Sequence, residues 1–152
     1  MMHIRITIVF IAFCVVPILA TAQNNPKEAA SASCPVASDV GNARLFGRWQ
    51  AQVQDGPDGA AQQATLTLER NPEFGGSLSG TITRGAAKAQ VAGDVDNGVF
   101  TLEESSDGNA ITATWTGQIV EGSCGREIRG VWKNVPGHSE HAFILRKQAS
   151  WQ

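Results

Sequence analysis

The feature that most constrains the fold is a two-residue rhythm of apolar and polar side chains that runs from about Leu45 to Lys147. In one segment, for example, Ala64, Leu66 and Leu68 alternate with polar neighbours. A period of two with one polar face is typical of antiparallel strands, because successive side chains of a strand point to opposite faces. No segment has a convincing amphipathic helical period, which argues against crossover helices and parallel strands.

This rhythm predicts eight strands, which are separated by clusters of Gly, Asn, Asp and Pro that favour tight turns. The predicted strands are 45–54, 63–70, 77–84, 88–95, 99–104, 110–119, 126–133 and 140–147. Between the fourth and fifth strands, Asn97 and Gly98 predict a type I′ hairpin turn, since both residue types tolerate a positive φ.

Four glycines interrupt the apolar face in the middle of predicted strands: Gly80, Gly93, Gly117 and Gly130. Glycine inside a strand is unfavourable unless the backbone bends sharply or another group approaches closely. Inward-facing glycines therefore favour the strong coiling of a narrow barrel, whose closure also removes exposed sheet edges. We expect an all-β fold with a single eight-stranded antiparallel up-and-down β-barrel.

The N-terminus has the pattern of a secretory signal peptide. Arg5 precedes an apolar run that ends in Ala20-Thr21-Ala22, and this run is too short for a membrane-spanning helix. Cys14 lies inside the apolar run, so we do not expect it to carry a lipid. The expected organisation is a signal peptide at 1–22, a flexible N-terminal tail at 23–43 and a β-barrel domain at 44–150, in a periplasmic or secreted protein.

Removal of the signal peptide leaves two cysteines, Cys34 and Cys124. An even pair of cysteines in an oxidising compartment predicts a disulfide. The alternative is two separate buried thiols.

The charge of the chain excludes some partners. Of its 12 basic residues, 11 remain after loss of Arg5, against 14 acidic ones, and the two signs are interspersed. Nucleic acids and anionic membrane surfaces attract basic patches, so we expect neither as a partner of the mature chain.

Two local motifs resemble the calycin group of lipocalin-like and avidin-like barrels. Gly47-Arg48-Trp49 resembles the G-x-W of the first strand, and the resemblance implies that Arg146 on the last strand lies across the Trp49 ring to close the barrel. Thr114 to Gln118, followed by Trp132, is similar to the T-W-S-G-Q strand and later tryptophan of avidin-like proteins. The chain has no tyrosine, whereas avidin-like pockets use tyrosine to hold biotin.

The candidate ligand-binding residues are three tryptophans that the alternation places on the inner face: Trp49, Trp115 and Trp132. They either line a pocket or fill the barrel, since an eight-stranded barrel is filled by side chains or holds one small ligand. A cavity of roughly 300 Å³ or more would indicate a ligand carrier.

Charged and metal-binding candidates are weak. Glu104 follows the inner parity of Phe100 and Leu102, so it lies at the rim or inside, where Arg126 or Arg129 is its expected ion-pair partner. His138 and His141 share one loop region, but residues three apart on a strand face opposite sides. We name no catalytic residue, no metal site and no cofactor.

These observations predict an exported small β-barrel binding protein, not an enzyme, that binds a small apolar ligand. One alternative is a protein-binding module, such as a barrel-type protease inhibitor that inserts its 23–43 tail into an exported partner. Another is a structural envelope protein without a ligand. A secreted hydrolase ranks last, because no nucleophile, base and orienting group can be named.

Overall fold

The computed structural model describes residues 34–56 and 59–149. These residues belong to one compact unit, which spans 32–152. The predicted signal peptide at 1–22, with Cys14, and the first part of the predicted tail, at 23–33, lie outside the described residues.

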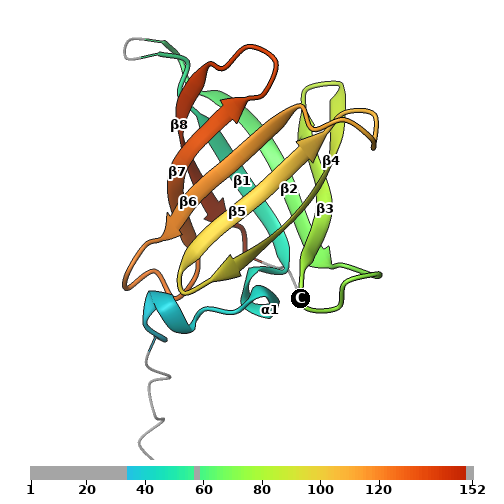
Figure 1. The fold of residues 1–152 in the computed structure, drawn as a ribbon. Coiled ribbons are helices and arrows are strands. Elements are labelled where there is room, and N and C mark those ends of the chain that lie inside the picture. Colours follow the sequence, from blue (N-terminus) through green and yellow to red (C-terminus); the bar gives the residue numbers. More distant parts are fainter. Residues whose placement is uncertain (1–33, 57–58, 150–152) are drawn as a thin grey trace, which may run out of the picture. The chain divides into compact units, whose positions relative to one another are not determined.

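Eight antiparallel strands form one closed barrel in sequence order, and the last strand pairs with the first (Figure 1). The strands are β1 (Gly47–Val53), β2 (Gln62–Arg70), β3 (Leu78–Arg84), β4 (Ala87–Asp96), β5 (Val99–Ser105), β6 (Ala113–Ile119), β7 (Glu127–Asn134) and β8 (Glu140–Lys147). This confirms the predicted all-β, up-and-down barrel. The two largest differences from the predicted strands lie at the start of β1, where Leu45 belongs to a short helix, and at the start of β6, where Ile111 lies in the preceding loop and is partly exposed.

The apolar side chains of the alternating pattern point into the barrel interior. In β2, for example, Ala64, Leu66 and Leu68 are buried, while Thr67 and Glu69 are exposed. Aromatic side chains fill the middle, where Trp115 and Phe143 meet edge to face with their ring centroids 4.9 Å apart. Each of these two rings is at most 2% exposed, so the centre of the barrel is a packed core.

The mid-strand glycines allow neighbouring backbones to approach closely. Gly117 and Gly130 are directly opposite each other in the β6–β7 pair. A Cβ atom added to Gly130 would lie 2.0 Å from the carbonyl oxygen of Thr116 and 2.4 Å from the Cα of Gly117. Side chains therefore cannot be added there without moving the backbone, as expected where strands coil tightly.

One end of the barrel, the capped end, is covered by residues 34–46. This segment contains the 3₁₀ turn η1 (Ala37–Asp39) and the helix α1 (Asn42–Leu45). Cys34 is joined to Cys124 by the predicted disulfide, with a Cα–Cα distance of 4.7 Å. The pairing fits an oxidising compartment.

Further contacts bind this segment to the barrel. The Asn42 amide accepts a hydrogen bond from the Val95 N–H and donates to Asp94 and to the Gly76 carbonyl. Val40 is 2% exposed. Residues 34–43, predicted to belong to a flexible tail, are thus part of the barrel structure, because they cover apolar side chains that the strands leave open.

The predicted barrel closure by Arg146 is wrong. Trp49 is buried at the capped end, where its indole N–H donates to the Leu45 carbonyl, and it follows Gly47 on β1 as predicted. The cation near its ring is Lys147, whose Nζ lies 5.8 Å from the ring centroid. Arg146 faces outward and binds Glu127 and Gln52. The physical reason is strand alternation: Phe143 and Leu145 point inward, so Lys147 does and Arg146 does not.

Candidate ligand site at the open end

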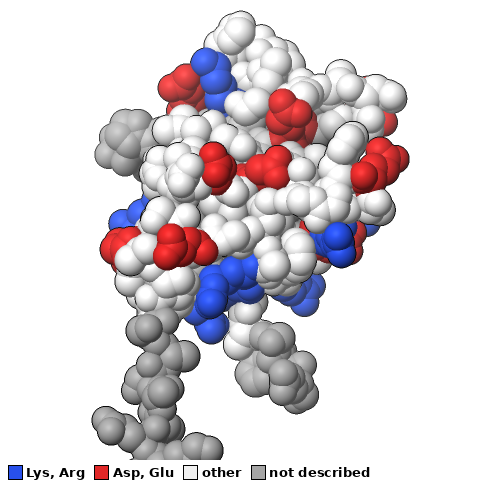
Figure 2. All heavy atoms as spheres, turned by 60° about the horizontal axis from the view of Figure 1, so that its bottom comes forward, with Lys and Arg blue, Asp and Glu red and all other residues white. Residues whose placement is uncertain are grey.

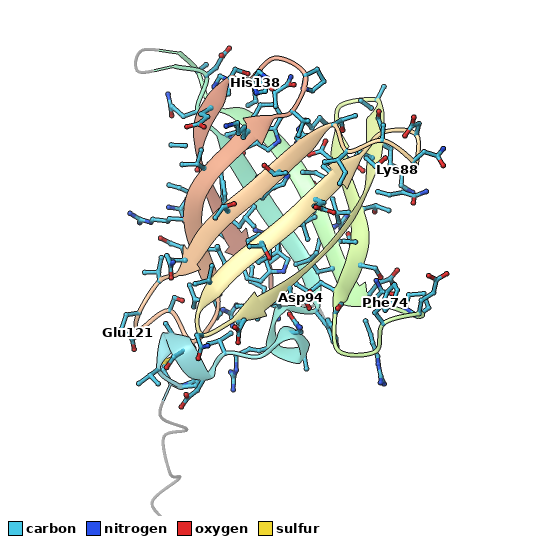
Figure 3. The ribbon with its side chains drawn as sticks, viewed as in Figure 1. Phe74, Lys88, Asp94, Glu121 and His138 are labelled. Carbon is cyan, nitrogen blue, oxygen red and sulfur yellow. A yellow bond between two sulfur atoms is a disulfide. The ribbon has the colours of Figure 1, made fainter. Side chains whose placement is uncertain are left out.

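The end of the barrel opposite the cap, called the open end here, carries a polar cluster at the mouth. In Figure 3, His138 and Lys88 mark this end, while Glu121 and Asp94 mark the capped end. Strand alternation positions the cluster. Arg84 ends the inward row of β3, and Glu104 ends that of β5. Trp132 lies near the end of the inward row of β7, one inward position before Asn134, and His141 begins the inward row of β8.

Glu104 and Arg84 form a two-pronged ion pair at the bottom of this mouth. The Arg84 Nη1 atom donates to Glu104 Oε1 at 2.5 Å, and Nη2 donates to Oε2 at 2.8 Å. Glu104 is the buried charged residue of the described chain, at 5% exposure, whereas the Arg84 side chain is 27% exposed. Such bidentate geometry gives the strongest kind of arginine–carboxylate contact.

Two tryptophans complete the surroundings of the Glu104 carboxylate. The indole N–H of Trp115 donates to Oε2 at 3.1 Å, and that of Trp132 lies 3.5 Å from the same oxygen. The Arg84 guanidinium lies 5.7 Å and 5.8 Å from the two ring centroids, within cation–π range. Among the described residues, every buried side-chain nitrogen and oxygen has a hydrogen-bond partner.

Electrostatics keep Glu104 charged. Burial raises the pKa of this carboxyl, but the hydrogen bonds and charge of Arg84, with the two indole donors, outweigh burial and hold the pKa below its ordinary value. Glu104 is therefore an ionised acceptor that is already fully engaged, and it is poorly suited to act as a general acid or base.

His141 forms part of the rim. Its Nδ1 atom lies 2.9 Å from the backbone carbonyl of Gln54, so Nδ1 carries the proton and the Nε2 atom is left for another partner. The ring packs against Trp132, its direct cross-strand neighbour, with centroids 5.5 Å apart. The Nδ1 atom of His141 thus donates to a backbone carbonyl.

A cup of about 220 Å³ lies at the mouth. Arg84 and Trp132 belong to its wall, together with Val53, Gln54, Asp55, Gln62, Asn134, Ser139 and His141. Most of these side chains are polar. The cup can therefore hold a small molecule by hydrogen bonds and by contact with one flat ring, and the packed core lies beneath it.

The three candidate tryptophans do not gather in one pocket. Trp49 lies at the capped end and Trp115 in the packed middle, and both are fully buried. Trp132 is half-buried and lines the cup. The expected partner of Glu104 was also wrong, because Arg126 and Arg129 lie toward the opposite end of β7, and Arg84 takes that place. The parity that Arg84 shares with Leu78 and Ile82 indicates that it faces inward, but it does not indicate its partner.

Within the described residues, no three His, Cys, Asp or Glu side chains lie close enough together to hold a metal ion. No helix in the described part of the chain is long and apolar enough to cross a membrane. Comparison with models of protein families finds no match, and comparison with curated proteins finds none either.

Proposed function

We propose that this chain is an exported, non-catalytic binding protein that holds a small, uncharged polar ligand in the cup at the open end. The observation that carries the proposal is Arg84, which lines a polar cup and is paired with the buried Glu104. The charges of the pair cancel, and two of the five guanidinium N–H groups satisfy Glu104, which leaves donors for a ligand. A calycin-like relationship is consistent with the closed eight-stranded barrel and forms part of the proposal.

The cup favours a polar ligand over the apolar one expected from the sequence. Its volume of about 220 Å³ is below the roughly 300 Å³ at which drug-sized pockets begin. The rings that would line an apolar cavity, Trp115 and Phe143, are packed against each other instead. A ligand with hydrogen-bonding groups and one flat face, which can contact Trp132, fits these walls best.

A fragment screen by protein-observed two-dimensional NMR tests the proposal, with neutral polar compounds in one set and alkyl compounds in another. We expect hits from the polar set, and we expect them to shift the indole resonance of Trp132. Gln62→Ala removes a cup side chain and should weaken these hits several-fold. Gln63→Ala is the matched control, because Gln63 lies on the outer face of the same strand and pairs there with Gln50.

Two results would contradict the proposal. One is preferential binding of the alkyl set, which would restore the apolar carrier. The other is an equal response of Gln62→Ala and Gln63→Ala, which would place the bound fragments outside the cup.

A second candidate function is binding of another exported protein, and one exposed ring favours it. Phe74, on the loop between β2 and β3, is 66% exposed (Figure 3). It borders a groove of about 530 Å³ on the outer face of the barrel. Asp94 and Glu103 also line this groove. A partner with a basic segment, such as an exported protease presenting a lysine-rich loop, would match both the ring and the charges.

Inhibition assays against purified exported proteases test this second function. Phe74→Ser should weaken inhibition at least tenfold if the ring is an anchor of the interface, whereas Ile111→Ser, which removes another exposed apolar side chain, should change it little. The tail that we expect to insert into a protease consists mostly of residues 23–33, which lie outside the described residues. Absence of inhibition by the unmodified protein would remove this candidate.

A further inference from the structure

Three basic side chains line one pocket at the capped end. They are Arg44 at the end of α1, Arg126 just before β7 and Lys147 at the end of β8. The pocket has a volume of about 500 Å³, and Gly125 and Gln148 also line it. Figure 2, which brings this end of the molecule forward, shows basic side chains gathered there. This pocket is at the opposite end of the barrel from the cup.

The fold holds these three residues together. The Lys147 N–H donates to the backbone carbonyl of Arg126 at 2.9 Å, which places the two side chains beside each other. The Lys147 ammonium donates to the backbone carbonyl of Arg44, so the helix of the cap is tied to the last strand. The barrel closure and the cap therefore bring the three residues together, while the side chains of Arg44 and Arg126 are exposed and available to a ligand.

Within residues 34–56 and 59–149, no salt bridge balances the charges of this cluster. The salt bridges among the described residues involve Arg84, Arg129, Lys133 and Arg146, and none involves a residue of this pocket. The neighbouring carboxylate, Glu127, is already bound by Arg129 and Arg146.

The pKa of Lys147 is affected by its two basic neighbours. Partial burial of the ammonium lowers the pKa of Lys147, and the positive charges of Arg126 and Arg44 lower it further. Three like charges thus stand close together in a protein whose net charge is −2. An anion bound between them would relieve their mutual repulsion.

We propose that this pocket binds the phosphate group of a ligand. Two guanidinium groups and one ammonium present a surplus of donors, and arginine forks match the oxygens of a phosphate in pairs. A pocket of about 500 Å³ exceeds the volume of a phosphate ion, so it has room for the organic part of a phosphate ester. The ligand is a soluble phosphorylated compound or the headgroup of an anionic phospholipid, which share this chemistry.

Titration of the protein with inorganic phosphate at low ionic strength, followed by two-dimensional amide NMR, tests the site. We expect saturable shifts of the amides of Gly125, Arg126 and Gln148. Arg126→Gln should weaken phosphate binding about tenfold or more, because it removes a charged hydrogen-bond donor. Lys88→Gln, which removes an exposed cation at the open end, is the matched control and should leave phosphate affinity unchanged.

Co-sedimentation with vesicles separates the two sources of phosphate. Binding to phosphatidylglycerol vesicles but not to phosphatidylcholine vesicles, with loss in Arg126→Gln, would identify a lipid headgroup. Saturable phosphate binding without vesicle binding would identify a soluble phosphate compound. Shifts that do not saturate, or equal phosphate affinity of Arg126→Gln and the unmodified protein, would overturn the proposal, whereas failure of the cup to bind polar fragments would leave it unaffected.

Discussion

At the residue scale, the facing glycines of β6 and β7 limit what the barrel can accommodate. Gly130→Ala places a methyl group within 2.0 Å of a backbone oxygen, so the strands must separate or shift. We expect the free energy of unfolding to fall by about 1–3 kcal/mol, as for overpacked cores. Urea unfolding measures this loss. Gly76→Ala is the control, because nothing lies within 4 Å of its added methyl group, and a loss as large as that of Gly130→Ala would contradict the close-approach argument.

We also expect Glu104 to contribute to the stability of the barrel. Glu104→Gln removes the negative charge that balances Arg84 near the floor of the cup. Breaking a buried ion pair from one side costs about 3–5 kcal/mol, and partial exposure of Arg84 reduces this, so we expect a loss of about 2–3 kcal/mol at pH 7. Glu103→Gln, one residue away on the outer face, should cost much less. Equal losses in urea unfolding would show that the pair does not stabilise the barrel.

The pH dependence of this effect follows from the lowered pKa of Glu104. The folded-state pKa is below the ordinary value of 4.5, so the unfolded state takes up the proton first as the pH falls. The stabilisation is present above pH 4.5 and is lost as the pH falls through the folded-state pKa. The difference in free energy of unfolding between the unmodified protein and Glu104→Gln should therefore be constant above pH 4.5 and shrink as the pH falls below it. Unfolding curves from pH 7 to pH 3 measure this difference, and a difference that stays constant throughout would contradict the assignment.

At the scale of elements, the strands and the cap depend on different interactions. Each strand is held by two neighbours, whereas the segment 34–46 is held by the disulfide and by hydrogen bonds such as those of Asn42 and of the Leu45 and Arg44 carbonyls. The disulfide and these hydrogen bonds thus hold a segment that its composition predicted to be a flexible tail. The cap nevertheless buries Val40 and Leu45 against the barrel, so loosening it exposes core.

Replacing both Cys34 and Cys124 with serine tests the contribution of the disulfide. The bridge joins residues 90 positions apart, and its loss should lower the free energy of unfolding by about 4–5 kcal/mol on a chain-entropy estimate. Thermal unfolding with and without a reductant measures the effect. The reductant should lower the melting temperature of the unmodified protein and leave that of the double variant unchanged. A double variant as stable as the unmodified protein would show that the cap is held without the bridge.

At the scale of the whole molecule, closure of the sheet makes the barrel one cooperative unit. Trp49 at the capped end and Trp115 in the middle belong to a single core, and β1 pairs with β8. We therefore expect one two-state unfolding transition. Far-ultraviolet circular dichroism and tryptophan fluorescence should give the same urea midpoint. Separated midpoints would mean that the two ends of the barrel unfold independently.

At the open end, the sequence predicted some features of the site and not others. The alternation placed Glu104 and Trp132 on the inner face, and both lie there. It did not identify Arg84 as the partner of Glu104, because these residues are 20 positions apart and meet through the register of three strands. The resemblance to calycin barrels placed Arg146 over Trp49, although the local alternation points to Lys147.

The sequence by itself determined the strands, their faces, the glycine positions and the cysteine pair. These depend on the side-chain alternation of neighbouring residues and on the small number of available cysteines. The tertiary structure decided that residues 34–46 form a cap, that Arg84 meets Glu104 and that Arg44, Arg126 and Lys147 share a pocket. These contacts join distant parts of the chain. They depend on strand register and barrel closure, and no local sequence pattern specifies either one.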